Sequence, residues 1–330
     1  SLVNKDSSYR DTVDLIWFPT GGGKTESYLA LAAFELIYRR VKYKEQGFGT
    51  GVIKRYTLRL LAAQQLQRAA TLISALELMR KEYIDTLLSE PFTLGFWVGG
   101  ATTPNRYNNP KKTIWQNDEG AKQRLDEALE SEEPVNHFQL LNCPICNSKI
   151  FPESREEDEN KYGVRATETS FKFFCPSQNC DLHENIPVTV IDEDIYKKPP
   201  SFIIGTIDKF ARLAWDGSAA TLFGTENTKP PYLVIQDELH LISGPLGTIA
   251  GIYEAAISTI IKSKEMIEPK YIAATATIRR SKQQIENLYG NEVNIFPPPG
   301  LSNKDSFFAK VNEDSPGRLF VGFMPQGQTS

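Results

Sequence analysis

Short apolar runs alternate with longer segments of helical periodicity through most of the chain. Runs that predict buried strands lie at residues 13–18, 51–56, 92–98, 202–204, 232–235 and 271–274. In the segments that follow, apolar residues recur at the spacing of one helix face, at residues 24–40, 60–80, 207–215, 247–262 and 281–289. Continuous apolar strands are typical of a parallel sheet covered by helices on both faces, so the pattern predicts an α/β fold.

A polar segment in the middle of the chain interrupts this alternation. Residues 117–132 predict a charged, exposed helix, and residues 138–190 hold four cysteines and a very polar loop. We therefore predict one sheet domain built from residues 1–137 and 191–300, with an insertion at 138–190. Residues 301–330 are predicted to form a linker that ends in the first strand of a further unit, at residues 318–323.

The composition is that of a folded, water-soluble protein. Hydrophobic residues make up 40% and charged residues 24% of the 330 positions. No apolar run approaches the ~18 residues that span a bilayer, so we expect no membrane partner. The chain starts without an initiator methionine and without an apolar stretch typical of a signal peptide. We expect it to be a piece of a longer protein.

The charge is unevenly distributed. The net charge of -4, from 37 basic and 41 acidic residues, gives no support for a nucleic-acid binder by itself. Residues 39–68, however, include eight basic residues and one acidic residue, whereas residues 118–159 include twelve acidic and four basic residues. A basic strip can follow a phosphate backbone on an acidic protein, because the potential acts within about 8–10 Å. A solvated helix face is the competing explanation.

The four cysteines form two close pairs. Two residues separate Cys143 from Cys146, four separate Cys175 from Cys180, and 28 residues lie between the pairs. Two such knuckles present four thiolates tetrahedrally to one Zn²⁺, and a site closed by four protein ligands is structural. Two disulfides would require an oxidising compartment, to which nothing in the sequence points. His183 could replace one thiolate, although a surface position is the simpler expectation.

A glycine-rich turn joins the first predicted strand to the first predicted helix. Residues 19–25 read Pro-Thr-Gly-Gly-Gly-Lys-Thr. Glycines let backbone N–H groups turn toward a phosphate, Lys24 can reach the β- and γ-phosphates, and the Thr25 hydroxyl can ligate Mg²⁺. The flanking strand and helix distinguish it from an ordinary glycine-rich turn. We predict that ATP and Mg²⁺ bind to Thr20, Gly21, Gly22, Gly23, Lys24, Thr25 and Glu26.

Acidic and hydroxyl side chains follow two later strands. Asp237 and Glu238 come at the end of a buried strand, where adjacent acids are costly unless a cation compensates them. Asp237 would hold Mg²⁺ and Glu238 would act as general base toward the attacking water, with a helix cap as the competing role. Residues 274–277 read Ala-Thr-Ala-Thr, which is also compatible with a strand end and helix N-cap.

The three motifs in this order resemble the first RecA-like domain of superfamily 2 helicases of the DExH type. Pro-Thr-Gly-Gly-Gly-Lys-Thr, Asp-Glu-Leu-His and Thr-Ala-Thr lie on successive strand–helix units, and the resemblance covers about residues 13–296 apart from the insertion. The amino-acid sequence at residues 17–26, 55–61 and 237–247 most resembles that of the helicase-like subunit of bacterial DISARM anti-phage systems. The resemblance implies an ATP-dependent enzyme of the bacterial cytoplasm that works with another subunit of the same system.

The resemblance also implies roles for individual residues. It places His240 in catalysis with Lys24, Asp237 and Glu238, and it assigns the coupling of hydrolysis to motion to Thr275, Ala276 and Thr277. Residues 56–60 and 205–209 resemble motifs Ia and Ib, which touch the nucleic-acid backbone in the family. The implied backbone contacts, independent of base sequence and with DNA favoured over RNA, are Thr57, Arg59, Gly99, Gly100, Thr206 and Lys209. Arg55 is a further candidate from the basic strip.

One expected part of a helicase does not follow in the chain. A second RecA-like domain supplies an arginine finger, worth about 10³–10⁵ in rate in other nucleotidases. We expect this chain alone to bind Mg-nucleotide and nucleic acid, to hydrolyse ATP slowly and not to unwind duplexes. The main alternative is a nucleic-acid-binding or scaffolding module with a vestigial nucleotide site, against which the joint presence of Lys24, Thr25, Asp237 and Glu238 argues. A transporter ATPase would show a Leu-Ser-Gly-Gly-Gln segment, which is missing.

Overall fold

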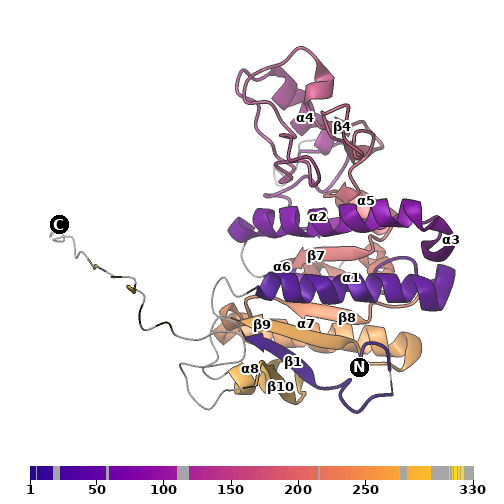
Figure 1. Cartoon of the computed structure of the whole chain (residues 1–330), viewed down its shortest axis with the longest axis vertical. Helices are drawn as coiled ribbons and strands as arrows, with labels where there is room; N and C mark the ends of the chain where they lie inside the picture. The colour runs from indigo at the N-terminus through magenta and orange to yellow at the C-terminus, as the bar shows by residue number, and fades with distance from the viewer. Residues whose placement is uncertain are drawn as a thin grey trace.

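An eight-stranded parallel sheet forms the centre of the computed structural model (Figure 1). The structure describes residues 1–4, 6–17, 23–56, 59–109, 119–214, 216–275 and 281–298, with seven single residues between 312 and 322; at residues 59–62, 212 and 214 only the backbone is described. The strands are β1 (Val13–Trp17), β2 (Val52–Tyr56), β3 (Leu94–Trp97), β6 (Val188–Thr189), β7 (Phe202–Thr206), β8 (Leu233–Gln236), β9 (Lys270–Thr275) and β10 (Val293–Phe296). The expected α/β fold is confirmed.

The strand order brings distant parts of the chain together at one sheet edge. The order is β10-β1-β9-β8-β2-β7-β3-β6, and every pairing is parallel. Trp17 at the end of β1 is in register with Thr275 at the end of β9, and Gln236 at the end of β8 is in register with Ala273. Because β9 lies between β1 and β8, the carboxyl ends of these three strands lie side by side.

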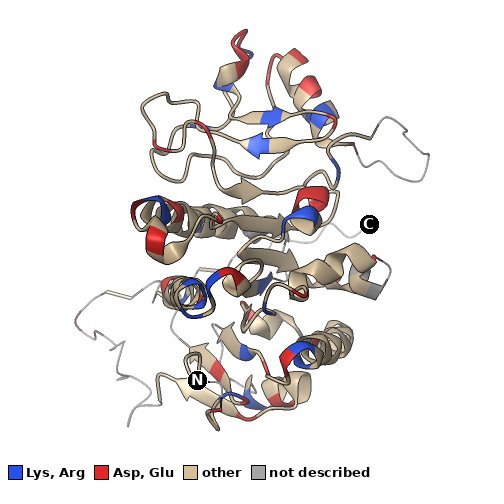
Figure 2. Cartoon of the chain, turned by 90° about the vertical axis from the view of Figure 1, so that its right-hand side faces the viewer, with Lys and Arg blue, Asp and Glu red and all other residues tan. Residues whose placement is uncertain are grey.

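Helices cover both faces of the sheet, as the continuous apolar strands predict. Each residue of β2, β7, β8 and β9 is buried. One face packs against α1 (Lys24–Tyr43) and α2 (Arg59–Glu82), and the other against α7 (Gly244–Glu265) and α8 (Ser281–Tyr289) (Figures 1 and 2). The shorter helices are α3 (Ile84–Leu87), α4 (Ala121–Glu130), α5 (Asp192–Lys197) and α6 (Ile207–Phe210).

The four-cysteine insertion stands beyond α2 at one end of the sheet (Figure 1). Its own sheet is an antiparallel hairpin of β4 (Val164–Ala166) and β5 (Phe171–Phe173). Phe138 packs its ring against those of Phe151, Phe171 and Phe173, with centroids 5.2–6.3 Å apart. Acidic residues gather at the outer tip (Figure 2). After the hairpin, β6 rejoins the main sheet beside β3, so the insertion is anchored at the sheet edge.

One helix among the described residues, α7, is long and apolar enough to cross a membrane by length and composition alone. Only 22% of its apolar window is buried, and large side chains such as Ile252 are exposed. Its inner side packs on the sheet through Ala250, Ile257 and Ile261. These contacts are those of a helix that covers an α/β sheet.

Two strands of the eight-stranded sheet, β6 and β10, were not expected from the periodicity, nor was the β4–β5 hairpin of the insertion. Val293–Phe296 forms β10 with alternating partial burial, and Val188–Thr189 is only two residues long, so neither has the continuous apolar run of a central strand. The helix predicted at 207–215 ends as an α-helix at Phe210 and continues in 3₁₀ turns. The strand predicted at 318–323 lies largely outside the described residues.

Candidate nucleotide site and four-cysteine centre

The start of α1 lies at the sheet edge where β1, β9 and β8 end. Residues 18–22, which include Thr20, Gly21 and Gly22, lie outside the described residues, and the description resumes at Gly23. Gly23 caps α1 with φ 86°, a left-handed conformation that favours glycine. The partly exposed side chains of Lys24 and Thr25 follow it in the first turn, where the helix dipole favours an anion. Glu26 is exposed and pairs with Arg68 of α2.

Asp237 is held by groups from three elements. Its side chain is 6% exposed, and Oδ1 accepts a hydrogen bond from the backbone N–H of Glu238 at 3.0 Å. Oδ2 accepts one from the hydroxyl of Tyr28 on α1 at 2.6 Å and lies 3.2 Å from Nζ of Lys54 on β2. The Tyr28 hydroxyl also lies 3.3 Å from Oγ1 of Thr25. The two predicted Mg²⁺ ligands, Thr25 and Asp237, therefore share one neighbouring hydroxyl, an arrangement that fits a hard cation with oxygen ligands.

Burial changes the acidity of the groups around Asp237. It lowers the pKa of Lys54 to about 8, and the negative charge of Asp237 opposes this shift. Burial and the same carboxylate raise the pKa of Tyr28, so its phenol stays protonated and can donate. Gln65 of α2 completes the cluster by accepting from Lys54 at 2.7 Å.

Glu238, His240 and Thr275 form a chain of contacts from β8 to β9. Glu238 has φ 49°, a strained conformation for a residue with a side chain, and its carboxylate is partly exposed. Its Oε2 lies 3.4 Å from Nδ1 of His240, and the same nitrogen lies 3.3 Å from Oγ1 of Thr275. His240 therefore links the predicted general base to the predicted coupling strand. Ala276 and Thr277 lie outside the described residues.

Four of the six predicted nucleic-acid residues follow the strands β2 and β3 in the chain. Thr57 lies outside the described residues, and Arg59 begins α2 without a described side chain. Gly99 and Gly100 follow β3, where the carbonyl of Gly99 accepts from the N–H of Thr102 at 2.8 Å.

Thr206 and Lys209 are buried, at 1% and 2% exposure. The ammonium of Lys209 donates to the carbonyl of Val98 at 2.9 Å and to Asn105 at 3.0 Å, and it lies 2.6 Å from Oδ2 of Asp192. These contacts connect α6 to the Gly99–Gly100 turn and to the helix that follows the insertion. The three N–H groups of the Lys209 ammonium thus have three acceptors within the protein.

The interpretation of residues 39–68 as a basic strip is wrong for four of its eight basic residues. Arg39 and Arg40 are buried and donate to backbone carbonyls, for example from Arg39 to Pro230 at 2.7 Å. Lys54 pairs with Asp237, and Arg55 pairs with Glu254 of α7 at 1% exposure. The side chains of these four residues are thus buried within the protein, and their partners come from other segments of the chain.

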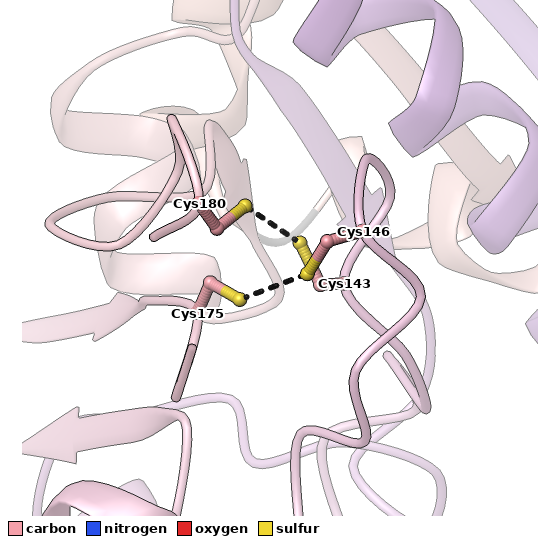
Figure 3. A group of neighbouring side chains, drawn as sticks. All are labelled: Cys143, Cys146, Cys175 and Cys180. Atoms are coloured by element: carbon pink, nitrogen blue, oxygen red, sulfur yellow. Dashed lines mark hydrogen bonds between the residues drawn. The ribbon is translucent and has the colours of Figure 1, made fainter. Parts of the chain in front are cut away.

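The four cysteine sulfurs converge on one point (Figure 3). All lie within 4.8 Å of one another, with 3.7 Å between the Sγ atoms of Cys143 and Cys180 and 3.3 Å between those of Cys146 and Cys175. All four are free thiols, and these distances between sulfur atoms are far longer than the ~2.05 Å of a disulfide bond. Thiolates about 2.3 Å from one tetrahedral Zn²⁺ lie about 3.8 Å apart, so the cluster fits zinc.

His183 does not belong to this cluster. Its Nδ1 lies 2.9 Å from the backbone carbonyl of Cys175 in the second knuckle. Burial raises the pKa of the Cys143 thiol to about 11. The expected set of four cysteines is therefore the one that the fold assembles.

Tyr28, Lys54 and Gln65 belong to the site but to none of the predicted motifs. Their proximity to Asp237 depends on the strand order, because α1, β2 and α2 are far from β8 in sequence. One signal was present. Lys54 is one of two charged residues in a strand whose other members are apolar, and a buried lysine needs a partner.

Comparison with known proteins finds a relative over nearly the whole chain. The chain is 38% identical to the DISARM protein DrmA of Bacillus paralicheniformis, across 99% of this chain and 32% of that protein. It thus spans about a third of the length of this relative. No family model matches the chain.

Solved helicase structures show weaker likeness. The DUF1998 helicase MrfA bound to DNA is 14% identical, covers 86% of this chain and 25% of its own, and has a TM-score of 0.40. Mss116p bound to single-stranded RNA and AMP-PNP is also 14% identical, covers 88% of this chain and 36% of its own, and has a TM-score of 0.43.

Proposed function

We propose that this chain, a homologue of part of the DISARM protein DrmA, is the ATP-binding part of a superfamily 2 nucleic-acid-dependent ATPase in bacterial anti-phage defence. One observation carries the proposal. The start of α1 with Lys24 and Thr25, the acids Asp237 and Glu238, and Thr275 lie at the same edge of the sheet, at the ends of neighbouring strands. In parallel α/β sheets, ligands bind outside the carboxyl ends of the strands.

Each residue at this edge has a distinct role in the proposal. Lys24 and the N–H groups of the first turn of α1 bind the phosphate oxygens, with Thr20, Gly21, Gly22, Gly23 and Glu26 completing the loop. Thr25 and Asp237 hold Mg²⁺, which supplies charge neutralisation on the phosphates. Glu238 accepts a proton from the attacking water. His240 couples the position of the Glu238 side chain to Thr275 through the 3.4 and 3.3 Å contacts of its Nδ1. Ala276 and Thr277 extend this coupling segment.

Nucleic acid binds in the proposal along the edge formed by β2, β7 and β3. Thr57, Arg59, Gly99 and Gly100 contact the backbone of DNA in preference to RNA, without reading bases. Thr206 is 1% exposed at the end of β7, so it supports this edge from within the protein. Lys209 acts indirectly, because its ammonium holds the Gly99–Gly100 turn through Val98. The four cysteines bind a structural Zn²⁺ that stabilises the insertion. The protein acts in the bacterial cytoplasm with another subunit of the same defence system.

Calorimetry with ADP, with and without Mg²⁺, tests the nucleotide site. The chain is expected to bind Mg-ADP, and Lys24→Ala is expected to weaken binding at least about tenfold, because a charge-assisted phosphate contact is lost. Lys262→Ala on the exposed face of α7 is the matched control and should bind as wild type does.

We expect steady-state hydrolysis by these 330 residues alone to be slow, because an arginine finger supplied from outside such a site adds about 10³–10⁵ in rate in other nucleotidases. Equal affinity of the wild type and Lys24→Ala for Mg-ADP, or no binding by either, would favour the nucleic-acid-binding module with a vestigial site. Fast turnover stimulated by single-stranded DNA would contradict the expectation of slow hydrolysis while supporting the motor assignment.

A further inference from the structure

A lysine outside every predicted motif lies beside the acid that is expected to hold Mg²⁺. Lys54 is the third residue of β2, and its side chain is 1% exposed. Its Nζ lies 3.2 Å from Oδ2 of Asp237 and donates to the Tyr28 hydroxyl and to Oε1 of Gln65, each at 2.7 Å. A lysine ammonium has three N–H groups, so each has an acceptor here.

Asp237 is correspondingly satisfied within the protein. Oδ2 receives the Lys54 ammonium and the Tyr28 hydroxyl, and Oδ1 receives the N–H of Glu238. A buried carboxylate without a cation is strongly destabilising, and Lys54 removes that penalty. Both carboxylate oxygens therefore have partners within the protein.

We propose that Lys54 is a resident counterion of the nucleotide site, with which Mg²⁺ competes for Asp237. This inference rests on the proposed function in taking Asp237 as a Mg²⁺ ligand. Two cations beside one carboxylate repel each other, so Lys54 opposes the binding of Mg²⁺ alone. Magnesium then enters together with a nucleotide, whose phosphates add the negative charge that offsets the repulsion. Lys54 makes the site selective for the Mg-nucleotide complex over the free ion.

Thermal unfolding with Mg²⁺ as the only addition tests the proposal. The melting temperature of the wild type is expected to change by less than about 1 °C between EDTA and 10 mM MgCl₂. Lys54→Met leaves Asp237 without a counterion, so its melting temperature in EDTA falls below that of the wild type. MgCl₂ should then raise it by about 3 °C or more, as for a ligand present at about ten times its Kd.

The chain offers a matched control. Lys270 on β9 is about as buried as Lys54, at 2% exposure, and lies at the opposite end of the strands. Its ammonium pairs with Asp14 at 3.1 Å and donates to backbone carbonyls. Lys270→Met should gain little from MgCl₂, because the Asp14 side chain is 34% exposed and water solvates its charge when the ammonium is removed, whereas the Asp237 side chain is 6% exposed. Equal gains in both variants, or no gain in Lys54→Met, would overturn the proposal.

Two further measurements keep the test decisive. Should Lys54→Met fail to fold, Lys54→Gln keeps a hydrogen-bond donor at this position but removes the positive charge, and it should show the same gain with MgCl₂; no gain would count against the proposal. Binding of ADP by the wild type is judged separately by calorimetry. If ADP fails to bind, the proposed function fails, while the response of the Lys54 variants to MgCl₂ still decides whether a metal site opens at Asp237.

Discussion

Replacing Arg55 tests whether the central basic residues support the fold rather than contact nucleic acid. Arg55 on β2 is 1% exposed and forms an ion pair with Glu254 of α7, which is 5% exposed. At an effective dielectric constant of about 20, two unit charges about 4 Å apart attract by roughly 4 kcal/mol. Removing one partner leaves the other charge buried and uncompensated, which costs about 3–5 kcal/mol. Arg55→Met and Glu254→Leu should each lower the free energy of unfolding by about this amount.

The double variant separates the ion pair from simple packing. With both charges replaced by apolar side chains, no uncompensated charge remains, and such replacements are close to neutral. Urea denaturation followed by circular dichroism should therefore give a double variant far more stable than the sum of the single variants predicts, with a coupling of at least about 2 kcal/mol.

Binding of fluorescent single-stranded DNA supplies the functional readout. Arg55→Met, measured where it is folded, should bind within about twofold of the wild type, because its guanidinium contacts α7 and not the surface. Arg59→Ala should bind more weakly under the same conditions, as expected of a phosphate contact. An Arg55→Met protein of wild-type stability that has lost DNA binding would refute the reasoning.

Three other predictions concern the zinc site, the turn after β3 and the cap of α1. The purified chain should carry about one zinc by native mass spectrometry, and Cys143→Ser should lose the metal and expose the insertion to limited proteolysis. Lys209→Met should lower the free energy of unfolding, measured by urea denaturation, by about 3–5 kcal/mol and should weaken DNA binding. The control Lys198→Met breaks an exposed ion pair with Glu90 and should change the free energy of unfolding by less than about 1 kcal/mol. Gly23→Ala forces a side chain into φ 86° and should lower stability by about 1–2 kcal/mol and weaken Mg-ADP binding in calorimetry.

Elements with a strong local pattern were predicted well. The helix expected at 24–40 is α1, and the strands expected at 51–56 and 271–274 are β2 and β9. The prediction succeeds here because a helix packed on a sheet repeats its apolar positions at helical spacing, and a central strand forms a run of buried residues. It fails for the two-residue β6 and for the half-buried edge strand β10, which have too few apolar positions to show a period.

The charged residues show where sequence reasoning stops. Lys54 and Arg55 are neighbours in β2, and alternation along a strand sends their side chains to opposite faces of the sheet. One meets Asp237 beside α1 and the other meets Glu254 on α7. Both partners lie far along the chain, so their positive charges resembled a surface strip in the sequence.

The sequence by itself determined the alternation of strands and helices, the phosphate-loop motif, the acid pair Asp237–Glu238 and the two cysteine knuckles, because each is a pattern within a few residues. The tertiary structure decided the strand order that places β9 between β1 and β8, and with it the contacts of Lys54, Arg55 and Lys209. The physical reason is that the energy of a charge depends on its separation in space from other charges and on its exposure to water. Spacing along the chain specifies neither.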